Sequence, residues 1–259
     1  MSYIDALILG LIQGLTEFLP VSSSGHLEIG KVLLGVSMKE NITFTIVVHG
    51  ATVCSTIVVF YKEIGNLFKG LFDFKWNEST AYIMKLLVSC IPVLLVALFF
   101  EKKVEELFTG NIILVGIMLL FTALLLGFTY FAKPKNNRIT LTHSFIIGIS
   151  QAIAVIPGIS RSGATISSGL LLGDNREEVA RFSFLMVLIP IIGKNLLDLF
   201  SGTLTKDPSQ IMPLIIGFIS AFISGWIACK LMINIVKRSK LIYFAAYCFL
   251  VGILALILS

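Results

Sequence analysis

Six apolar segments, each about 20 residues long, limit what this chain can fold into. They lie at about 42–61, 79–100, 111–131, 180–200, 211–230 and 240–258. A helix of roughly 20 apolar residues crosses the hydrocarbon layer of a bilayer. Hydrophobic residues make up 56% of the sequence and charged residues only 14%, whereas soluble domains carry about 25% charged residues. These features predict an all-α integral membrane protein and exclude a water-soluble domain. No basic patch interleaved with aromatic residues occurs, so we expect no nucleic-acid partner.

Two further apolar regions, 3–36 and 141–173, contain breaks that interrupt a straight membrane-spanning helix. The first is interrupted by Pro20 and three serines, and the second by Pro157 and Gly158. Irregular backbone at membrane depth is stable only where it is buried in protein or lines a wet cavity. We therefore expect each region to form a re-entrant helical hairpin, which enters and leaves on the same face, in addition to the six spans.

The two interrupted regions resemble each other in sequence. A shift of 138 residues aligns 10–35 with 148–173, and 8 of the 26 positions are identical. Three predicted spans separate equivalent points of the two copies, and an odd number of spans inverts the second copy. Inverted repeats place broken helices opposite each other near the bilayer midplane. We predict a single membrane domain, 1–259, built from inverted repeats at 1–131 and 141–258.

The positively charged residues predict the orientation in the membrane. With both hairpins re-entrant, twelve Lys and Arg residues lie in the loops on one side and five on the other. The richer loops are 62–78, 132–143, 174–181 and 230–240. Because cytoplasmic loops are enriched in Lys and Arg, these loops face the cytoplasm, and the first hairpin and both termini face outward. An amphipathic pattern in 62–74 indicates a helix along the inner membrane surface.

Ionisable side chains flank the first break, at a depth where they are costly and usually mark a site. Gln13 and Glu17 are four residues apart and so share a helix face. Glu17 is a candidate general base, and Glu17 with Gln13 is a candidate cation site. His26 follows the break and is a candidate proton carrier, because imidazole titrates near neutral pH.

The first break itself contains Ser22, Ser23, Ser24 and Gly25. Each serine is a candidate nucleophile or hydrogen-bond donor to phosphate, and a serine nucleophile needs an adjacent base. The residues alone leave the three serines as equivalent candidates. A structural role for one of them is compatible with chemistry in another, since one serine is expected to cap the helix from Gly25 onward.

The second break carries a fixed positive charge, Arg161, where the first copy has Ser23. Ser160, Ser162, Gly163 and Thr165 surround it. A guanidinium binds phosphate oxygens in a fork, and the N-terminus of the following helix also favours an anion. We predict a phosphate cradle made of these residues. The alternative is a structural arginine that reaches the interface or pairs with a carboxylate.

Other polar residues in the apolar segments receive simpler interpretations. His49 lies alone inside a span and is interpreted as a packing or supporting residue. Glu28 and Lys31 follow the first break and are expected to face the outer surface, and His143 is assigned to the start of a helix without a role. The four cysteines are scattered singly, which favours packing over a zinc or redox site.

Two motifs resemble a known family. They are Gln13-x-x-x-Glu17-Phe18-Leu19-Pro20-Val21-Ser22-Ser23-Ser24-Gly25-His26 and Pro157-Gly158-Ile159-Ser160-Arg161-Ser162-Gly163-Ala164-Thr165. In their sequence and spacing they are similar to the bacterial undecaprenyl-diphosphate phosphatases, also called bacitracin-resistance proteins. Some members of that family carry Glu where this chain has Gln13.

The resemblance implies hydrolysis of undecaprenyl diphosphate to undecaprenyl phosphate and inorganic phosphate. This reaction recycles the lipid carrier of cell-wall synthesis and deprives bacitracin of its target. The resemblance also implies a divalent cation, Mg²⁺ or Ca²⁺, near the diphosphate and an active site open to the outer face of the bacterial plasma membrane. As partners we expect the lipid diphosphate and the bilayer, and we allow for a homodimer.

Together with the resemblance, the residues lead to one mechanism, in which Ser22, Ser24 and Gly25 contact the phosphate, and leave one rival class. Ser23 attacks the terminal phosphoryl group held by Arg161, and His26 transfers the proton; a water nucleophile, or His26 as phosphoryl acceptor, is the alternative. The rival is a polyprenyl-phosphate flippase or transporter, because inverted repeats with broken helices also build transporters. A carrier needs an anion site but no nucleophile, so the Ser, His and Glu side chains favour an enzyme.

Overall fold

The computed structural model describes residues 1–36, 42–108, 110–132, 135–200, 210–238 and 240–257, and this part of the chain is helical. The helices are α1 (Tyr3–Phe18), α2 (Ser23–Leu33), α3 (Ile42–Val59), α4 (Tyr61–Phe72), α5 (Glu78–Glu105), α6 (Ile112–Phe128), the short 3₁₀ helix η2 (Thr129–Phe131), α7 (Leu141–Ile153), α8 (Arg161–Leu171), α9 (Arg176–Met186), α10 (Leu188–Phe200), α11 (Ile211–Lys237) and α12 (Ile242–Ile257). The predicted all-α class is confirmed. Lys39, Lys133 and Lys206 of the charge count, and Leu258 at the end of the sixth predicted span, lie outside the described residues.

All six apolar segments fall on helices, and four of the described helical stretches are long and apolar enough to cross a membrane. These are Glu78–Val104, Ile112–Phe131, Arg176–Leu197 and Ile211–Lys237. A fifth is α3 with α4, if this pair, bent by 76°, counts as one span. The chain is therefore a multi-pass membrane protein. The segment predicted at 180–200 begins earlier, at Arg176, and is divided into α9 and α10.

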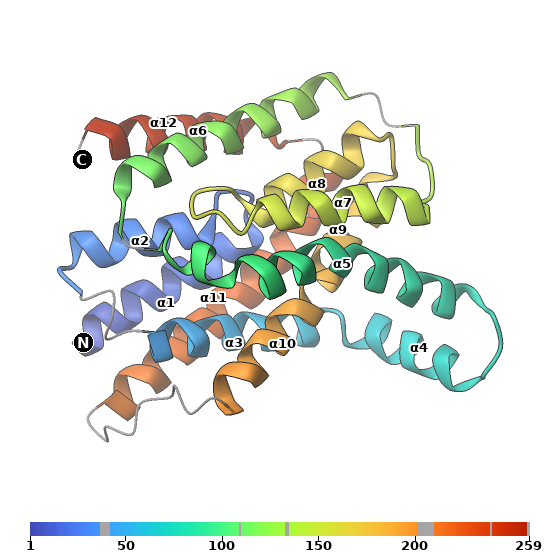
Figure 1. Cartoon of the computed structure of the whole chain (residues 1–259), viewed down its shortest axis with the longest axis horizontal. Coiled ribbons are helices and arrows are strands. Elements are labelled where there is room, and N and C mark those ends of the chain that lie inside the picture. Colours follow the sequence, from blue (N-terminus) through green and yellow to red (C-terminus); the bar gives the residue numbers. More distant parts are fainter. Residues whose placement is uncertain (37–41, 109, 133–134, 201–209, 239, 258–259) are drawn as a thin grey trace.

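Both interrupted regions form pairs of helices around a break. α1 and α2 flank residues 19–22, and α7 and α8 flank residues 154–160. The helix starts obey the shift of 138 residues, since α1 and α7 begin at Tyr3 and Leu141, and α2 and α8 at Ser23 and Arg161. In Figure 1 the pair α1–α2 opens at the end of the molecule where both termini lie, and α7–α8 opens at the opposite end. Their breaks therefore meet in the middle.

Small residues hold the two helix pairs close to their neighbours. A Cβ atom added at Gly10 or Gly14 of α1 would lie 2.0 Å from a serine hydroxyl of α11. A Cβ atom added at Gly148 of α7 would lie 2.4 Å from the carbonyl oxygen of Ser89 on α5. Close backbone approach through small residues is a common basis of helix association in membranes. It fixes α1 and α7, and hence the two breaks, against the long helices α11 and α5.

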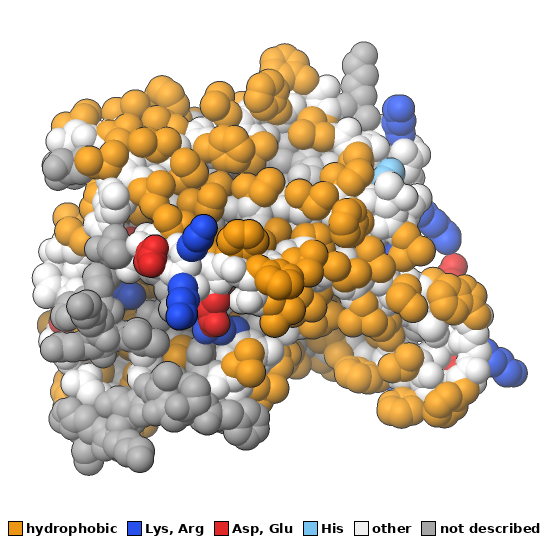
Figure 2. Space-filling view, viewed as in Figure 1, with side chains coloured by type: hydrophobic (Ala, Val, Ile, Leu, Met, Phe, Trp, Pro, Cys, Tyr) orange, Lys and Arg blue, Asp and Glu red, His pale blue; other side chains and the backbone are white. Residues whose placement is uncertain are grey.

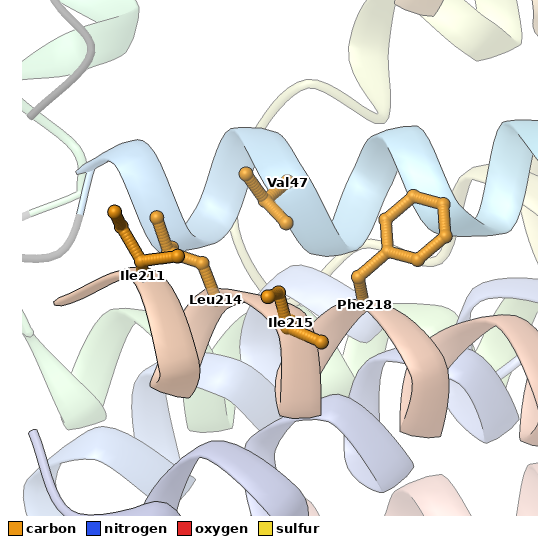
Figure 3. A pocket seen from close by; sticks show the side chains of 5 residues that line it. All are labelled: Val47, Ile211, Leu214, Ile215 and Phe218. Atoms are coloured by element: carbon orange, nitrogen blue, oxygen red, sulfur yellow. The ribbon is translucent and has the colours of Figure 1, made fainter.

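The outer surface of the bundle is apolar, as a bilayer requires. Figure 2 shows hydrophobic side chains over much of the face in view. An apolar groove of about 280 Å³ lies between α3 and α11, lined by Val47, Ile211, Leu214, Ile215 and Phe218 (Figure 3). All five side chains are hydrocarbon, so this groove offers hydrophobic contact and no reactive group.

Candidate active site

Glu17, near the C-terminal end of α1, is the centre of a polar cluster drawn from four helices. Ser23 Oγ donates to Glu17 Oε2 at 2.6 Å, and Gln13 Nε2 donates to the same oxygen at 2.9 Å. Arg161 Nη2, from α8, donates to the other carboxylate oxygen, Oε1. His49 Nε2, from α3, lies 3.9 Å from Oε2. The Glu17 side chain is only 7% exposed, so one buried carboxylate joins a hydroxyl, an amide and a guanidinium.

The serines before α2 and α8 cap these helices in the same way. Ser22 Oγ accepts a hydrogen bond from the N–H of Gly25 at 3.3 Å, and Ser160 Oγ accepts one from the N–H of Gly163 at 3.0 Å. Each capping hydroxyl lies 3.3 Å from the hydroxyl two residues later; these are Ser24 and Ser162. The expected serine cap is confirmed, although α2 begins at Ser23, two residues before the predicted start.

The caps bring two helix N-termini to the same carboxylate. Ser23 and Arg161 are the first residues of α2 and α8, and both contact Glu17. The N-terminus of a helix carries partial positive charge and unpaired N–H groups, which favour an anion. Ser22 adopts a φ of 71°, a left-handed conformation that is strained for a residue other than glycine and often found at functional sites. The local backbone therefore supports anion binding between the two breaks.

The two breaks touch each other through glycines. A Cβ atom at Gly25 would lie 3.1 Å from the Cα atom of Gly158. Gly158 itself has a φ of +98°, and a Cβ atom there would lie 2.6 Å from the carbonyl oxygen of Val115 on α6. Ser162 Oγ also donates to the carbonyl oxygen of Leu19 at 3.2 Å. The contacts of Gly25 with Gly158 and of Ser162 with Leu19 hold the first and second motif at a fixed distance, so the cluster is preorganised.

Two atoms of the cluster are buried without a hydrogen-bond partner among the described residues, Gln13 Oε1 and Arg161 Nη1. The guanidinium N–H suits a phosphate oxygen. The amide oxygen beside a carboxylate suits a hard cation such as Mg²⁺ or Ca²⁺, which binds oxygen ligands. The described residues contain no group of three His, Cys, Asp or Glu side chains that could hold a metal. A cation here would thus take further ligands from water and substrate phosphate, as Mg²⁺ commonly does.

Comparison with known proteins agrees with the two motifs. A family model described as bacitracin resistance protein BacA matches residues 6–254. The chain belongs to the bacitracin resistance protein BacA family. A protein of Bacteroides fragilis named undecaprenyl-diphosphatase is 54% identical over 100% of this chain and 99% of its own length. Proteins of the same name from Parabacteroides distasonis and Korarchaeum cryptofilum are 53% and 37% identical, over 99% and 98% of this chain and 98% of their own lengths.

Thr165 and His26, two further predicted site residues of this BacA family member, form hydrogen bonds to groups other than Glu17. Thr165 is fully buried, and its hydroxyl bonds to the carbonyl oxygen of Arg161 at 2.9 Å and to Ser183 Oγ at 2.7 Å. It supports the backbone of α8 rather than opening to a ligand. His26 bonds through Nδ1 to the carbonyl oxygen of Ser22 at 2.8 Å and through Nε2 to the hydroxyl of Tyr247 at 2.9 Å.

Glu28 and Lys31 do not face the outer surface, and that expectation is wrong. Glu28 is 4% and Lys31 6% exposed. Glu28 Oε2 accepts from the N–H of Gly110 at 2.9 Å, and Lys31 Nζ donates to Thr45 Oγ1 at 3.1 Å. Their partners come from distant segments, so both charges are buried where hydrogen bonds compensate them.

Sequence reasoning missed or undervalued two residues near the breaks. His49 faces Glu17, and Tyr247 of α12 bonds to His26. Each stands alone in an apolar segment without a motif around it. The only signal in the sequence was the cost of a polar group at membrane depth, which does not identify the partner.

Proposed function

We propose that this chain hydrolyses undecaprenyl diphosphate to undecaprenyl phosphate and inorganic phosphate. Relatives that carry the name undecaprenyl-diphosphatase align with essentially the whole chain at 53–54% identity. The observation that carries the proposal is the contact of Glu17 with both Ser23 and Arg161, because a base, a nucleophile and a phosphate-binding cation meet at one point. Loss of the lipid diphosphate would also remove the target of bacitracin.

In our proposal the fold has six spans and two re-entrant hairpins in inverted repeats, 1–131 and 141–258. The opposite openings of α1–α2 and α7–α8 (Figure 1) support this arrangement. The excess of Lys and Arg in the loops on one side supports an outward-facing first hairpin. The active site then opens to the outer face of the bacterial plasma membrane, where the lipid diphosphate enters from the bilayer. A homodimer stays a prediction.

The first step is an exchange of partners at Arg161. Without substrate, Glu17 neutralises the guanidinium. The terminal phosphoryl group competes for Arg161 and for the N–H groups at the start of α2 and α8. Release from the guanidinium leaves the Glu17 carboxylate free to accept the proton of the Ser23 hydroxyl that it already faces. Substrate binding thus activates Glu17.

The second step is attack by Ser23 on the terminal phosphorus. Its Oγ already donates to Glu17 Oε2, so the proton moves to Glu17 as the Oγ–P bond forms. The bond from phosphorus to the bridging oxygen breaks, and undecaprenyl phosphate leaves with the electron pair. Positioning and charge stabilisation supply most of the rate in phosphoryl transfer, and we assign the hydroxyls of Ser22, Ser24, Ser160 and Ser162, which lie at the starts of α2 and α8, to this positioning.

The third step releases phosphate from Ser23. A water molecule attacks the phosphorus and gives its proton to His26, the P–Oγ bond breaks, and Ser23 recovers its proton from Glu17. His26 then returns its proton to solvent at the outer face. General acid–base catalysis of this kind contributes about 10²–10⁴-fold.

We propose Gln13 and Glu17 as the protein ligands of a divalent cation, Mg²⁺ or Ca²⁺. The unpartnered Gln13 Oε1 supports this assignment. A bound cation would neutralise charge on the diphosphate, in addition to Arg161.

Phosphate release by the purified chain tests the proposal. The protein in detergent should release inorganic phosphate from undecaprenyl diphosphate when Mg²⁺ or Ca²⁺ is present, and the Ser23→Ala variant should not. If the wild-type chain binds the lipid but releases no phosphate with either cation, the hydrolase assignment is wrong and the flippase alternative gains support.

A further inference from the structure

His26 is held by hydrogen bonds at both ring nitrogens. Nδ1 lies 2.8 Å from the carbonyl oxygen of Ser22, and Nε2 lies 2.9 Å from the hydroxyl of Tyr247. The His26 and Tyr247 rings are stacked, with centroids 5.6 Å apart and planes inclined by 11°. Tyr247 comes from α12, 221 residues away along the chain. This aromatic neighbour belongs to neither of the two sequence motifs.

The partners of His26 determine which nitrogen can take up a proton. A carbonyl oxygen only accepts, so Nδ1 carries hydrogen and donates to Ser22. In the neutral imidazole, Nε2 is then the acceptor and the Tyr247 hydroxyl is the donor. Any proton that His26 receives must arrive at Nε2, and the hydroxyl of Tyr247 already occupies that position.

Tyr247 is fixed in place by the packing of α12. The next residue, Cys248, is fully buried and its Sγ lies 3.6 Å from the carbonyl oxygen of Pro20 in the first break. One turn later, a Cβ atom at Gly252 would lie 2.9 Å from the carbonyl oxygen of Gly116 on α6. α12 is therefore held against the first break and against α6. Tyr247 itself is 44% exposed and His26 is half-buried, so the hydrogen-bonded pair lies at the surface of the bundle rather than in its core.

We propose that Tyr247 is the relay through which His26 takes the proton of the attacking water, an inference that rests on the hydrolysis proposed above. The Tyr247 oxygen accepts a proton from the water as its own proton passes to His26 Nε2. One water O–H bond and the tyrosine O–H bond break, and a new tyrosine O–H bond and the Nε2–H bond form. The water oxygen bonds to phosphorus, the Oγ of Ser23 leaves, and tyrosine ends unchanged while His26 carries the positive charge.

The test compares Tyr247→Phe with Tyr243→Phe in the full chain. Tyr243 lies one turn earlier on α12 and is 68% exposed, so its substitution controls for loss of a tyrosine hydroxyl on this helix. With undecaprenyl diphosphate and the divalent cation, Tyr247→Phe should lower kcat by about 10-fold or more with KM changed less than about twofold. Tyr243→Phe should match the wild type in both constants. Both variants should keep the thermal unfolding midpoint of the wild type, because Phe retains the ring.

A double variant separates a relay from a packing role. In a His26→Asn background, Tyr247→Phe should cause no further loss of kcat, because the two residues act as a unit. Additive losses would overturn the inference, as would a rise in KM at unchanged kcat or wild-type kinetics of Tyr247→Phe. These outcomes presuppose an active wild type. A wild-type chain that releases no phosphate would instead overturn the proposed function.

Discussion

Replacement of Glu17 by Gln tests the exchange of partners at Arg161. Glutamine keeps the shape of the side chain but removes the negative charge that neutralises the guanidinium. We expect Glu17→Gln to lose turnover by about 10²–10⁴-fold, because the base for Ser23 is gone. We also expect the same variant to bind inorganic phosphate more tightly, because phosphate no longer competes with a carboxylate.

The expected gain in phosphate affinity follows from the buried geometry. Side chains of Glu17 and Arg161 are only 7% and 16% exposed, so solvent screens their charges weakly. A unit negative charge roughly 5 Å from a bound phosphate costs about 3 kcal/mol at an effective dielectric constant of about 20. Relaxation and water entry reduce this value. We therefore expect a gain of at least about tenfold in affinity, or about 1.4 kcal/mol.

Binding of inorganic phosphate is measured by titration calorimetry in EDTA, so that no divalent cation contributes. Glu78→Gln is the matched control, since Glu78 pairs with Arg138 at the exposed surface, where the two side chains are 93% and 85% accessible. The control should bind phosphate as the wild type does. Equal or weaker phosphate binding by Glu17→Gln would refute the exchange and would leave Glu17 as a ligand for the cation.

Three further substitutions test the nucleophile, the contact between the breaks and the cation site. Ser23→Ala should lower kcat by at least about 100-fold and abolish a trapped phosphoserine; near-normal turnover, with His26→Ala inactive, would assign the nucleophile elsewhere. Gly158 has a φ of +98°, and a Cβ atom there would lie 2.6 Å from a backbone carbonyl oxygen. Gly158→Ala should therefore destabilise the protein by about 2–4 kcal/mol and lower its thermal unfolding midpoint. Gly193→Ala, with open space around the added methyl group, should leave that midpoint unchanged. Gln13→Ala should raise the Mg²⁺ concentration for half-maximal activity by about tenfold, and an unchanged cation requirement would remove Gln13 from the site.

The breaks and their caps could be predicted because they depend on local chemistry. Pro20 and Pro157 lie beside serines or glycines in the breaks, which favours an end of the preceding helix, and Ser22 and Ser160 cap the helices that follow. The internal repeat added a long-range prediction, the opposition of the two breaks. In the structure, Glu17 of the first helix pair and Arg161 of the second are in contact where the two breaks face each other.

The remaining contacts depend on tertiary packing and could not be read from local pattern. Thr165 has the residue type of a phosphate ligand, but the rotation of α8 directs its hydroxyl to Ser183. Glu28 is buried and accepts a hydrogen bond from the N–H of Gly110, 82 residues away along the chain. His49 and Tyr247 meet the site only because α3 and α12 pack beside the first helix pair. The sequence of one helix predicts which of its residues share a face. Which other helix packs against that face depends on the arrangement of the whole bundle.

Divergence of the two copies at one position explains why the site needs both. Ser23 and Arg161 are equivalent first residues of α2 and α8, and each contacts a different oxygen of Glu17. Two arginines would bring two buried cations to one carboxylate and leave no serine hydroxyl beside it. Two serines would leave the buried carboxylate without a positively charged side chain, at a steep cost in a low-dielectric site. Only the mixed pair gives a neutral resting cluster of one carboxylate and one guanidinium, which is the arrangement that the proposed exchange of partners at Arg161 requires.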